Sequence, residues 1–120
     1  MRKSLSVLAL LLAITLTTYA QSTQKGDFIA NLNSENWTLN AGSGMRTHIV
    51  FVKFSTPYTE APSVLLSLTG YDGKAGKDGN SSVLLKAENI TRDGFVIKIA
   101  TWGDSRVVGV EGSWLAFGKQ

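Results

Sequence analysis

The amino-acid sequence predicts an all-β fold, an antiparallel β-sandwich of about six strands. Apolar and polar residues alternate with a period of two almost throughout the chain after residue 20, which is typical of half-buried strands. The apolar positions are rich in Val, Ile and Phe, which pack well on a pleated surface. Turn-forming residues recur at roughly ten-residue spacing, as in all-β sandwiches. No segment of this pattern requires a helix.

The first half of the chain contains three of these strands. A short opening strand is expected near residues 28–32. Residues 48–54 alternate β-branched and aromatic side chains on both faces, so both faces are expected to be at least half covered. Residues 63–69 form the next strand. Pro62 marks its entrance, because proline has no N–H to donate to a β-ladder, and Gly70 marks its end.

The second half contains the remaining strands. Residues 83–88 and 95–100 alternate in the same way, and Thr91-Arg92-Asp93-Gly94 between them is typical of a hairpin turn. The last strand is expected at residues 106–117, where Gly109 and Gly112 indicate a bend or a bulge. The glycine-rich segment 71–80 is expected to be the longest flexible loop and 33–44 the next. Binding residues commonly lie on such loops.

The first twenty residues have the pattern of a signal peptide. Arg2 and Lys3 precede an apolar run at residues 5–16, and small Ala20 follows a short polar segment. The run is shorter than the roughly 20 apolar residues that a membrane span needs. We therefore expect cleavage after Ala20 and an exported domain at residues 21–120, secreted, extracellular or, in a bacterium, periplasmic, with no membrane insertion after cleavage. The acceptor sequences at Asn36, Asn80 and Asn89 matter only in a eukaryotic secretory pathway.

Composition excludes several classes of protein. A chain of 120 residues has room for one domain, and without cysteine it has no disulfide framework. Twelve basic residues exceed nine acidic ones, but two of the basic residues belong to the leader and the others are scattered among acids. A nucleic-acid binder would carry a clustered basic stripe, so no nucleic-acid partner is expected. Oligomerisation would help a domain this small to bury apolar surface.

Catalytic and metal-binding patterns are also missing from the sequence. The single histidine, His48, lies inside a strand pattern and is expected to pack in the core or an interface, so the chain is not expected to be an enzyme. Gly76-Lys77 lacks the spacing of a phosphate-binding loop. Asp72, Asp78 and Asn80 depart from the spacing of a calcium loop, so neither a metal nor another cofactor is expected.

Residues 89–118 carry an ordered series of short motifs, Asn-Ile-Thr, Gly-Phe, Thr-Trp-Gly-Asp and Ser-Trp-Leu-Ala. This series resembles the closing half of an H-type lectin domain, and residues 46–62 and 64–69 extend the resemblance upstream. It covers about three quarters of the chain, from roughly Trp37 to Gly118. The resemblance implies a secreted six-stranded sandwich that forms trimers and binds galactose or N-acetylgalactosamine in a cleft between protomers. A trimer would also cover the second apolar face of residues 48–54.

Four residues become candidates for carbohydrate binding through this resemblance. Trp102 matches the tryptophan that touches the sugar, and it follows a strand, where an indole can stack on the apolar face of a pyranose. Gly103 stands where a family member has histidine, and Ser82 where it has arginine. Ser43 is nearest to an aspartate supplied by the neighbouring protomer. These departures remove charge-assisted hydrogen bonds, which are the stronger kind.

Two functions remain open at this point. The first is a lectin for galactose-type glycans, multivalent through a homotrimer or higher homo-oligomer. The second is a structural trimerisation or adhesion module with a degenerate sugar site, in which Trp102 only caps the sandwich. Trp37 is expected to pack, and Trp114 to lie in the core or a subunit interface.

Overall fold

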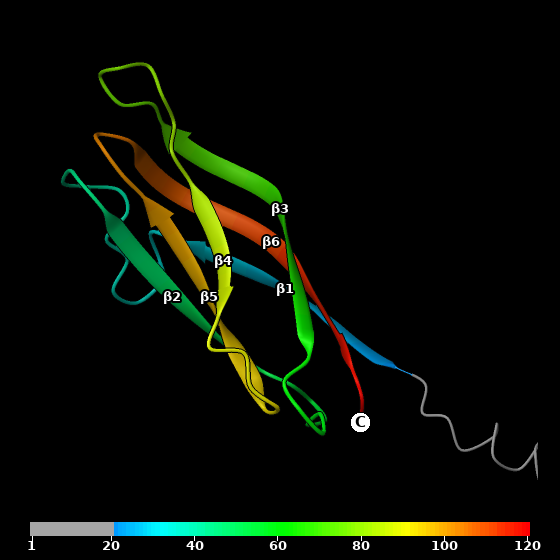
Figure 1. The fold of residues 1–120 in the computed structure, drawn as a ribbon. Coiled ribbons are helices and arrows are strands. Elements are labelled where there is room, and N and C mark those ends of the chain that lie inside the picture. The colour runs from blue at the N-terminus through cyan, green and yellow to red at the C-terminus, as the bar shows by residue number, and fades with distance from the viewer. Residues whose placement is uncertain (1–20) are drawn as a thin grey trace, which may run out of the picture.

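The computed structural model describes residues 21–120 and confirms an all-β sandwich of six antiparallel strands (Figure 1). One three-stranded sheet has the order β1-β6-β3 and the other the order β2-β5-β4. The predicted signal peptide, residues 1–20, lies outside the described residues. The strands are β1 (Ser22–Asn31), β2 (Arg46–Lys53), β3 (Ser63–Lys74), β4 (Leu84–Glu88), β5 (Gly94–Thr101) and β6 (Arg106–Gly118).

Two strands extend further than the sequence pattern predicts. β1 begins at Ser22 rather than near residue 28, because its polar first half pairs with the end of β6. β3 continues to Lys74, since Tyr71 and Asp72 pair with Val110 and Gly109 of β6. The loop predicted at 71–80 is therefore confined to residues 75–83, and residues 32–45 form the longest irregular segment among the described residues. Backbone pairing with the long β6 outweighs the local preference of glycine and polar residues for loops.

β6 is the central strand of its sheet and carries the irregularity that its glycines predict. Its register with β3 shifts between Asp72 and Gly73, where Val108 beside Gly109 is the extra residue, and between Leu68 and Gly70, where Thr69 is the extra residue opposite Gly112. Gly112 has a second role, because a side chain there would collide with the ring of Phe28 and with the Ser67 carbonyl 2.6 Å away. Only glycine allows the two partner strands to pack this closely against β6.

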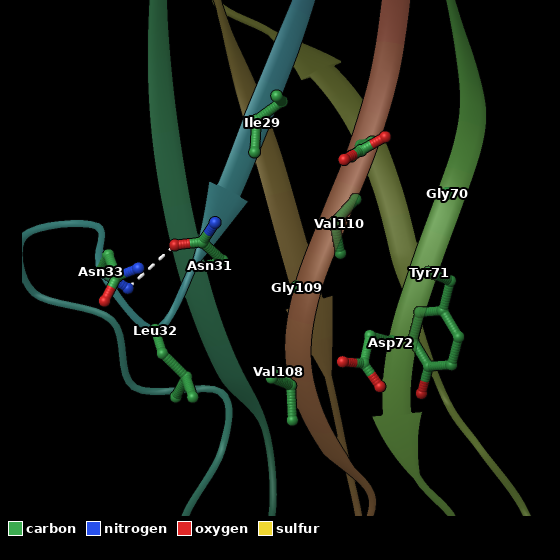
Figure 2. Close-up of a pocket in the computed structure, with 11 residues that line it drawn as sticks. Ile29, Asn31, Leu32, Asn33, Gly70, Tyr71, Asp72, Val108, Gly109 and Val110 are labelled. Carbon is green, nitrogen blue, oxygen red and sulfur yellow. Dashed lines mark hydrogen bonds between the residues drawn. The ribbon is translucent and has the colours of Figure 1, made fainter.

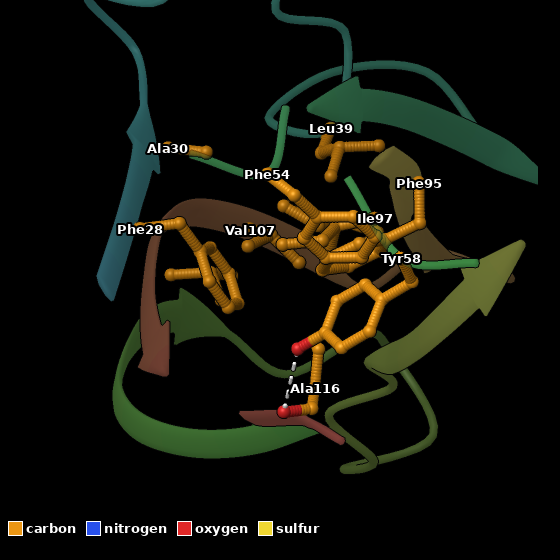
Figure 3. Close-up of a cluster of buried hydrophobic side chains, with 11 residues drawn as sticks. Phe28, Ala30, Leu39, Phe54, Tyr58, Phe95, Ile97, Val107 and Ala116 are labelled. Atoms are coloured by element: carbon orange, nitrogen blue, oxygen red, sulfur yellow. Dashed lines mark hydrogen bonds between the residues drawn. The ribbon is translucent and has the colours of Figure 1, made fainter. Parts of the chain in front are cut away.

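The core lies between the two sheets and is rich in aromatic rings (Figure 3). The rings of Phe54 and Tyr58 meet edge to face at 5.1 Å, and those of Phe95 and Trp114 at 5.5 Å. Such pairs contribute roughly 0.5–1.5 kcal/mol beyond the area they bury. The Tyr58 hydroxyl donates to the Ala116 carbonyl at 3.3 Å, so this buried polar atom is satisfied.

The remaining predicted packing residues anchor the loop of residues 32–45. Trp37 donates from its indole N–H to the Val107 carbonyl at 3.0 Å, and its ring lies 4.9 Å from that of His48. Leu39 is completely buried, and its carbonyl accepts from the Val107 N–H at 2.8 Å. His48 and Trp37 therefore pack, as predicted, and they tie this loop to the start of β6.

The outer faces of both sheets are open to solvent in the single chain. On β2, Ile49 is 49% exposed and Phe51 81% exposed. The expectation that both faces of residues 48–54 are half covered is therefore wrong for one protomer, since within residues 21–120 no second layer lies on the outer side of this sheet. The hairpin between β4 and β5 closes as predicted, with the Thr91 N–H donating to the Gly94 carbonyl at 2.9 Å.

Candidate functional site

Trp102 lies at the end of β5, in the turn that leads into β6. Its side chain is 42% exposed, so the indole offers a face to solvent rather than capping the core. It borders a polar cleft of about 320 Å³, which we name the Trp102 cleft. The structure brings Ser82, Trp102 and Gly103 together here. The cleft is lined by Asp78, Asn80, Ser81, Ser82, Trp102, Gly103, Asp104 and Ser105.

Two buried hydroxyl groups hold the floor of the Trp102 cleft. The Thr101 hydroxyl donates to the Ser82 carbonyl at 2.7 Å, and the Ser82 N–H donates to the Ser105 hydroxyl oxygen at 2.9 Å. Thr101 and Ser105 are both buried, so these bonds are shielded from water. The Ser82 backbone is thereby fixed between the end of β5 and the start of β6.

The cleft carries two carboxyl groups and no basic side chain among its lining residues, Asp78 and Asp104 being the acids. Asp78 closes a tight turn: its side chain accepts from the Asn80 N–H at 2.9 Å. This hydrogen bond to the charged form holds the pKa of Asp78 below its ordinary value of 3.8. Asp78 is therefore ionised at neutral pH and gives the cleft negative charge.

Gly103 has a left-handed backbone conformation, with φ at 64°. A side chain at this position would meet no other atom within 4 Å, so space is available but the backbone favours glycine. The positive φ, and not a lack of space, is therefore what favours glycine over a larger residue at position 103.

Ser43, the fourth predicted residue, is exposed and is not among the residues that line the Trp102 cleft of its own chain. Its loop nevertheless touches the Trp102 turn, because the Gly44 N–H donates to the Gly103 carbonyl at 3.1 Å. The structure thus joins the Ser43 loop to the cleft without placing Ser43 in it.

Arg46, at the start of β2, is a residue that the sequence interpretation missed. Its guanidinium donates to the carbonyl oxygens of Gly44 at 3.0 Å and Ala41 at 2.9 Å. It also donates to those of Gly103 at 2.8 Å and Ser105 at 2.9 Å. Because all four acceptors are backbone atoms, no pairing of residue types in the sequence reveals the arrangement. Asp78 and Asp104 were missed as cleft residues for a related reason, since folding alone brings residues 78–82 beside residues 102–105.

Larger hollows lie away from Trp102, on the outer face of the β1-β6-β3 sheet. One of about 510 Å³ includes Ile29, Asp72 and Glu111 (Figure 2), and a second of about 600 Å³ includes Leu65 and Leu115. In the first, the Asn33 N–H donates to the Asn31 side-chain oxygen at 2.8 Å. Their size alone does not make them sugar sites. The second is lined by Trp114, but this ring packs against Phe95 in the core, so neither hollow borders a tryptophan as exposed as Trp102. They show instead that this sheet has a hollowed, partly apolar outer surface.

Within residues 21–120, no cluster of three or more His, Cys, Asp or Glu side chains is placed to bind a metal ion. In the same part of the chain, no helix has the length and hydropathy to cross a membrane.

Comparison with known proteins connects this chain to a family. The sequence model of the H-type lectin domain matches residues 49–117. A protein of Fuscovulum blasticum, described as ATP synthase subunits region ORF 7, is 40% identical over 83 residues, 69% of this chain and 68% of the relative. Discoidin-2 of Dictyostelium discoideum is 34% identical over 70 residues, 58% of this chain and 27% of discoidin-2.

Comparison with solved structures agrees with the sequence comparison. The structure of wild-type discoidin II from Dictyostelium discoideum matches with a TM-score of 0.75 and 28% identity, over 87% of this chain and 39% of discoidin II. The chain thus spans less than half the length of the discoidins it matches. The family match covers more than half of the chain itself, and the six strands have a structural counterpart in a solved relative. This chain belongs to the H-type lectin family.

Proposed function

We propose that the protein is an exported lectin that binds uncharged galactose or N-acetylgalactosamine-type glycans in the Trp102 cleft, as part of a homotrimer. Membership of a carbohydrate-binding family supports binding rather than catalysis. The observation that carries the proposal is the 42% exposed indole of Trp102 at the edge of a polar cleft. Sugar sites combine an aromatic face for the C–H patch of the ring with converging polar groups for its hydroxyls.

The polar groups of the cleft suit a neutral sugar. Carboxylates of Asp78 and Asp104 can accept hydrogen bonds from sugar hydroxyls, and charge-assisted bonds of this kind are stronger than neutral ones. They compensate in part for the missing arginine at Ser82. The same carboxylates repel a sulfated or carboxylated glycan, because like charges at a site disfavour each other.

A trimer would give weak single sites a useful affinity. Each hydrogen bond to a sugar contributes only about 0.5–1.5 kcal/mol after water is displaced, so one shallow site binds weakly. Several sites on one assembly act together through effective concentration. In a cyclic assembly the loop of residues 41–44 would face the cleft of the next copy and bring Ser43 toward its sugar.

Export rests on the leader pattern of residues 1–20. Mass spectrometry of the exported protein is expected to find Gln21 at its N-terminus. A first residue within the apolar run would contradict cleavage after Ala20.

The second candidate function is a trimerisation or adhesion module without sugar binding. The residues that favour it are Ser43, Ser82 and Gly103, which lack the charged or imidazole groups of the family pattern. Such a module would keep its assembly through surfaces other than the Trp102 cleft. The two functions therefore differ in what Trp102 does.

The decisive experiment is a glycan array with the protein of residues 21–120 and two variants. Trp102→Ala is expected to lose binding to galactose-type glycans, while Trp102→Tyr keeps part of it because an aromatic face remains. Both variants should keep the mass of the assembly in light scattering, since the indole is not part of the core. If the unaltered, folded protein binds no glycan, the module without sugar binding is the correct function.

A further inference from the structure

Among the described residues, Arg46 is the one side chain that hydrogen-bonds to both the loop of residues 41–44 and the turn of residues 103–105. Its backbone also pairs with Thr101, the residue before Trp102. Each arm of the guanidinium reaches a different segment: Nε and Nη1 bind Gly44 and Ala41, and Nη2 binds Gly103 and Ser105. One planar group therefore connects two segments that have no regular structure of their own.

The chemistry of these contacts is specific to arginine. The ion pairs of residues 21–120 are Lys86–Glu88 and Lys98–Glu88, so the four carbonyl bonds of Arg46 are made without a carboxylate partner. A guanidinium presents its donors as a rigid fork in one plane, whereas an ammonium is a compact point charge. An ammonium has only three N–H donors, so a lysine at this position cannot make all four bonds.

We propose that Arg46 is a positioning residue of the carbohydrate site, which sets the Trp102 turn and the Ser43 loop in their binding arrangement before the sugar arrives. This inference rests on the function proposed above. Groups that are already ordered strengthen binding, because less conformational entropy is lost when the ligand binds.

The same contact links neighbouring sites in the proposed trimer. In such a trimer the turn of residues 103–105 would line the cleft of its own chain, and the loop of residues 41–44 would face the cleft of the next copy. One guanidinium would thereby position groups at two sugar sites. If every copy lost the Arg46 contacts, each sugar site would be disturbed through its own chain and through the neighbouring chain.

The test compares Arg46→Lys with Arg106→Lys, a matched control whose exposed side chain lies on the nearby start of β6. Two readouts are needed: the affinity for a single galactose-type sugar by calorimetry, and hydrogen exchange of the Gly44 amide, which is bonded to Gly103. Arg46→Lys should weaken sugar affinity by roughly ten-fold, equivalent to about 1.4 kcal/mol. It should also speed Gly44 exchange severalfold, and Arg106→Lys should change neither.

Chemical rescue separates positioning from a purely structural role. In Arg46→Ala, added guanidinium at millimolar concentration should restore part of the sugar affinity, which sodium at equal ionic strength should not. The melting temperature and assembly mass of Arg46→Lys should stay close to those of the unaltered protein.

The outcomes distinguish this inference from the proposed function. If Gly44 exchange and sugar affinity are both unchanged in Arg46→Lys, or if exchange rises while affinity does not fall, the positioning role is overturned. If the unaltered protein binds no sugar, the proposed function fails, while faster Gly44 exchange in the variant would still support the link between the two segments.

Discussion

Asp78 and Asp104 define the charge of the Trp102 cleft at the scale of single residues, because no basic side chain lines the cleft beside them. We expect Asp78→Asn and Asp104→Asn each to raise affinity for a sulfated galactose, relative to plain galactose, by roughly three-fold, since exposed charge pairs contribute about 0.2–1 kcal/mol. Asp93→Asn, in the hairpin at the other end of β5, is the matched control. Calorimetry at low salt checks the ratio, and equal ratios in all variants would contradict a role for the two carboxylates.

The pH dependence of this selectivity follows from the lowered pKa of Asp78. The Asn80 N–H favours the ionised form, so the bond is present above the ordinary value of 3.8 and is lost only when pH falls through the lowered value. A sulfate ester stays charged across this range. The part of the rejection that Asp78 contributes, measured in Asp104→Asn, should therefore persist as acid is added to pH 3.8 and relax only below it. Relaxation well above pH 3.8 would assign the selectivity to a different group.

At the scale of strands and loops, the sequence predicted all six strands, although not all of their ends. Alternation revealed β2, β4 and β5 because one face of each packs on the core. The early start of β1 and the late end of β3 were missed, since polar and glycine residues there are held by pairing with β6 rather than by their own preference.

The candidate site was likewise predicted only in part. Trp102, Gly103 and Ser82 were predicted through a family resemblance, and the fold places all three at one cleft. Arg46 was missed because it binds backbone carbonyls of distant residues, and every residue type carries such a carbonyl. The alternation of apolar and polar residues predicts well which side chains are buried, but it predicts little about polar contacts between loops.

The loop of residues 32–45 depends on one buried side chain, Leu39, whose carbonyl also accepts from Val107. We expect Leu39→Ala to lower the free energy of unfolding by about 2–5 kcal/mol, the range for a buried leucine that leaves a cavity. It should also weaken sugar binding, because the loop carries the contacts to Gly103. Leu32→Ala, on the same loop but half exposed, should change stability by less than about 0.5 kcal/mol. Urea denaturation of both variants measures the difference, and similar losses would show that Leu39 is no anchor.

For the molecule as a whole, two open sheet faces compete to form the proposed trimer interface. The outer face of β2-β5-β4 exposes Phe51 and Ile49, but Lys98 on its central strand pairs with Glu88 there, and burying these charges would be costly. The outer face of β1-β6-β3 is hollowed around Leu65, which pairs with Leu115 of β6, and Lys25 and Asp27 of β1 border the same hollow. The two paired leucines form an apolar strip, and the centre of an interface is more apolar than its rim. We therefore propose that the trimer contact lies on the second face.

Replacing a central apolar residue by lysine tests this assignment. Leu65→Lys would place a charge at the middle of the proposed interface without disturbing the core, because the side chain points to solvent in the single chain. Its mass in light scattering is expected to fall from near three protomers to one, with a loss of multivalent binding to a glycan-coated surface and a smaller loss for a single sugar. Phe51→Lys, at a still more exposed position on the opposite sheet, should leave the trimer intact. If instead Phe51→Lys gives the monomer and Leu65→Lys the trimer, copies of the chain meet through β2, and Ser43 would have to approach its neighbour from that side.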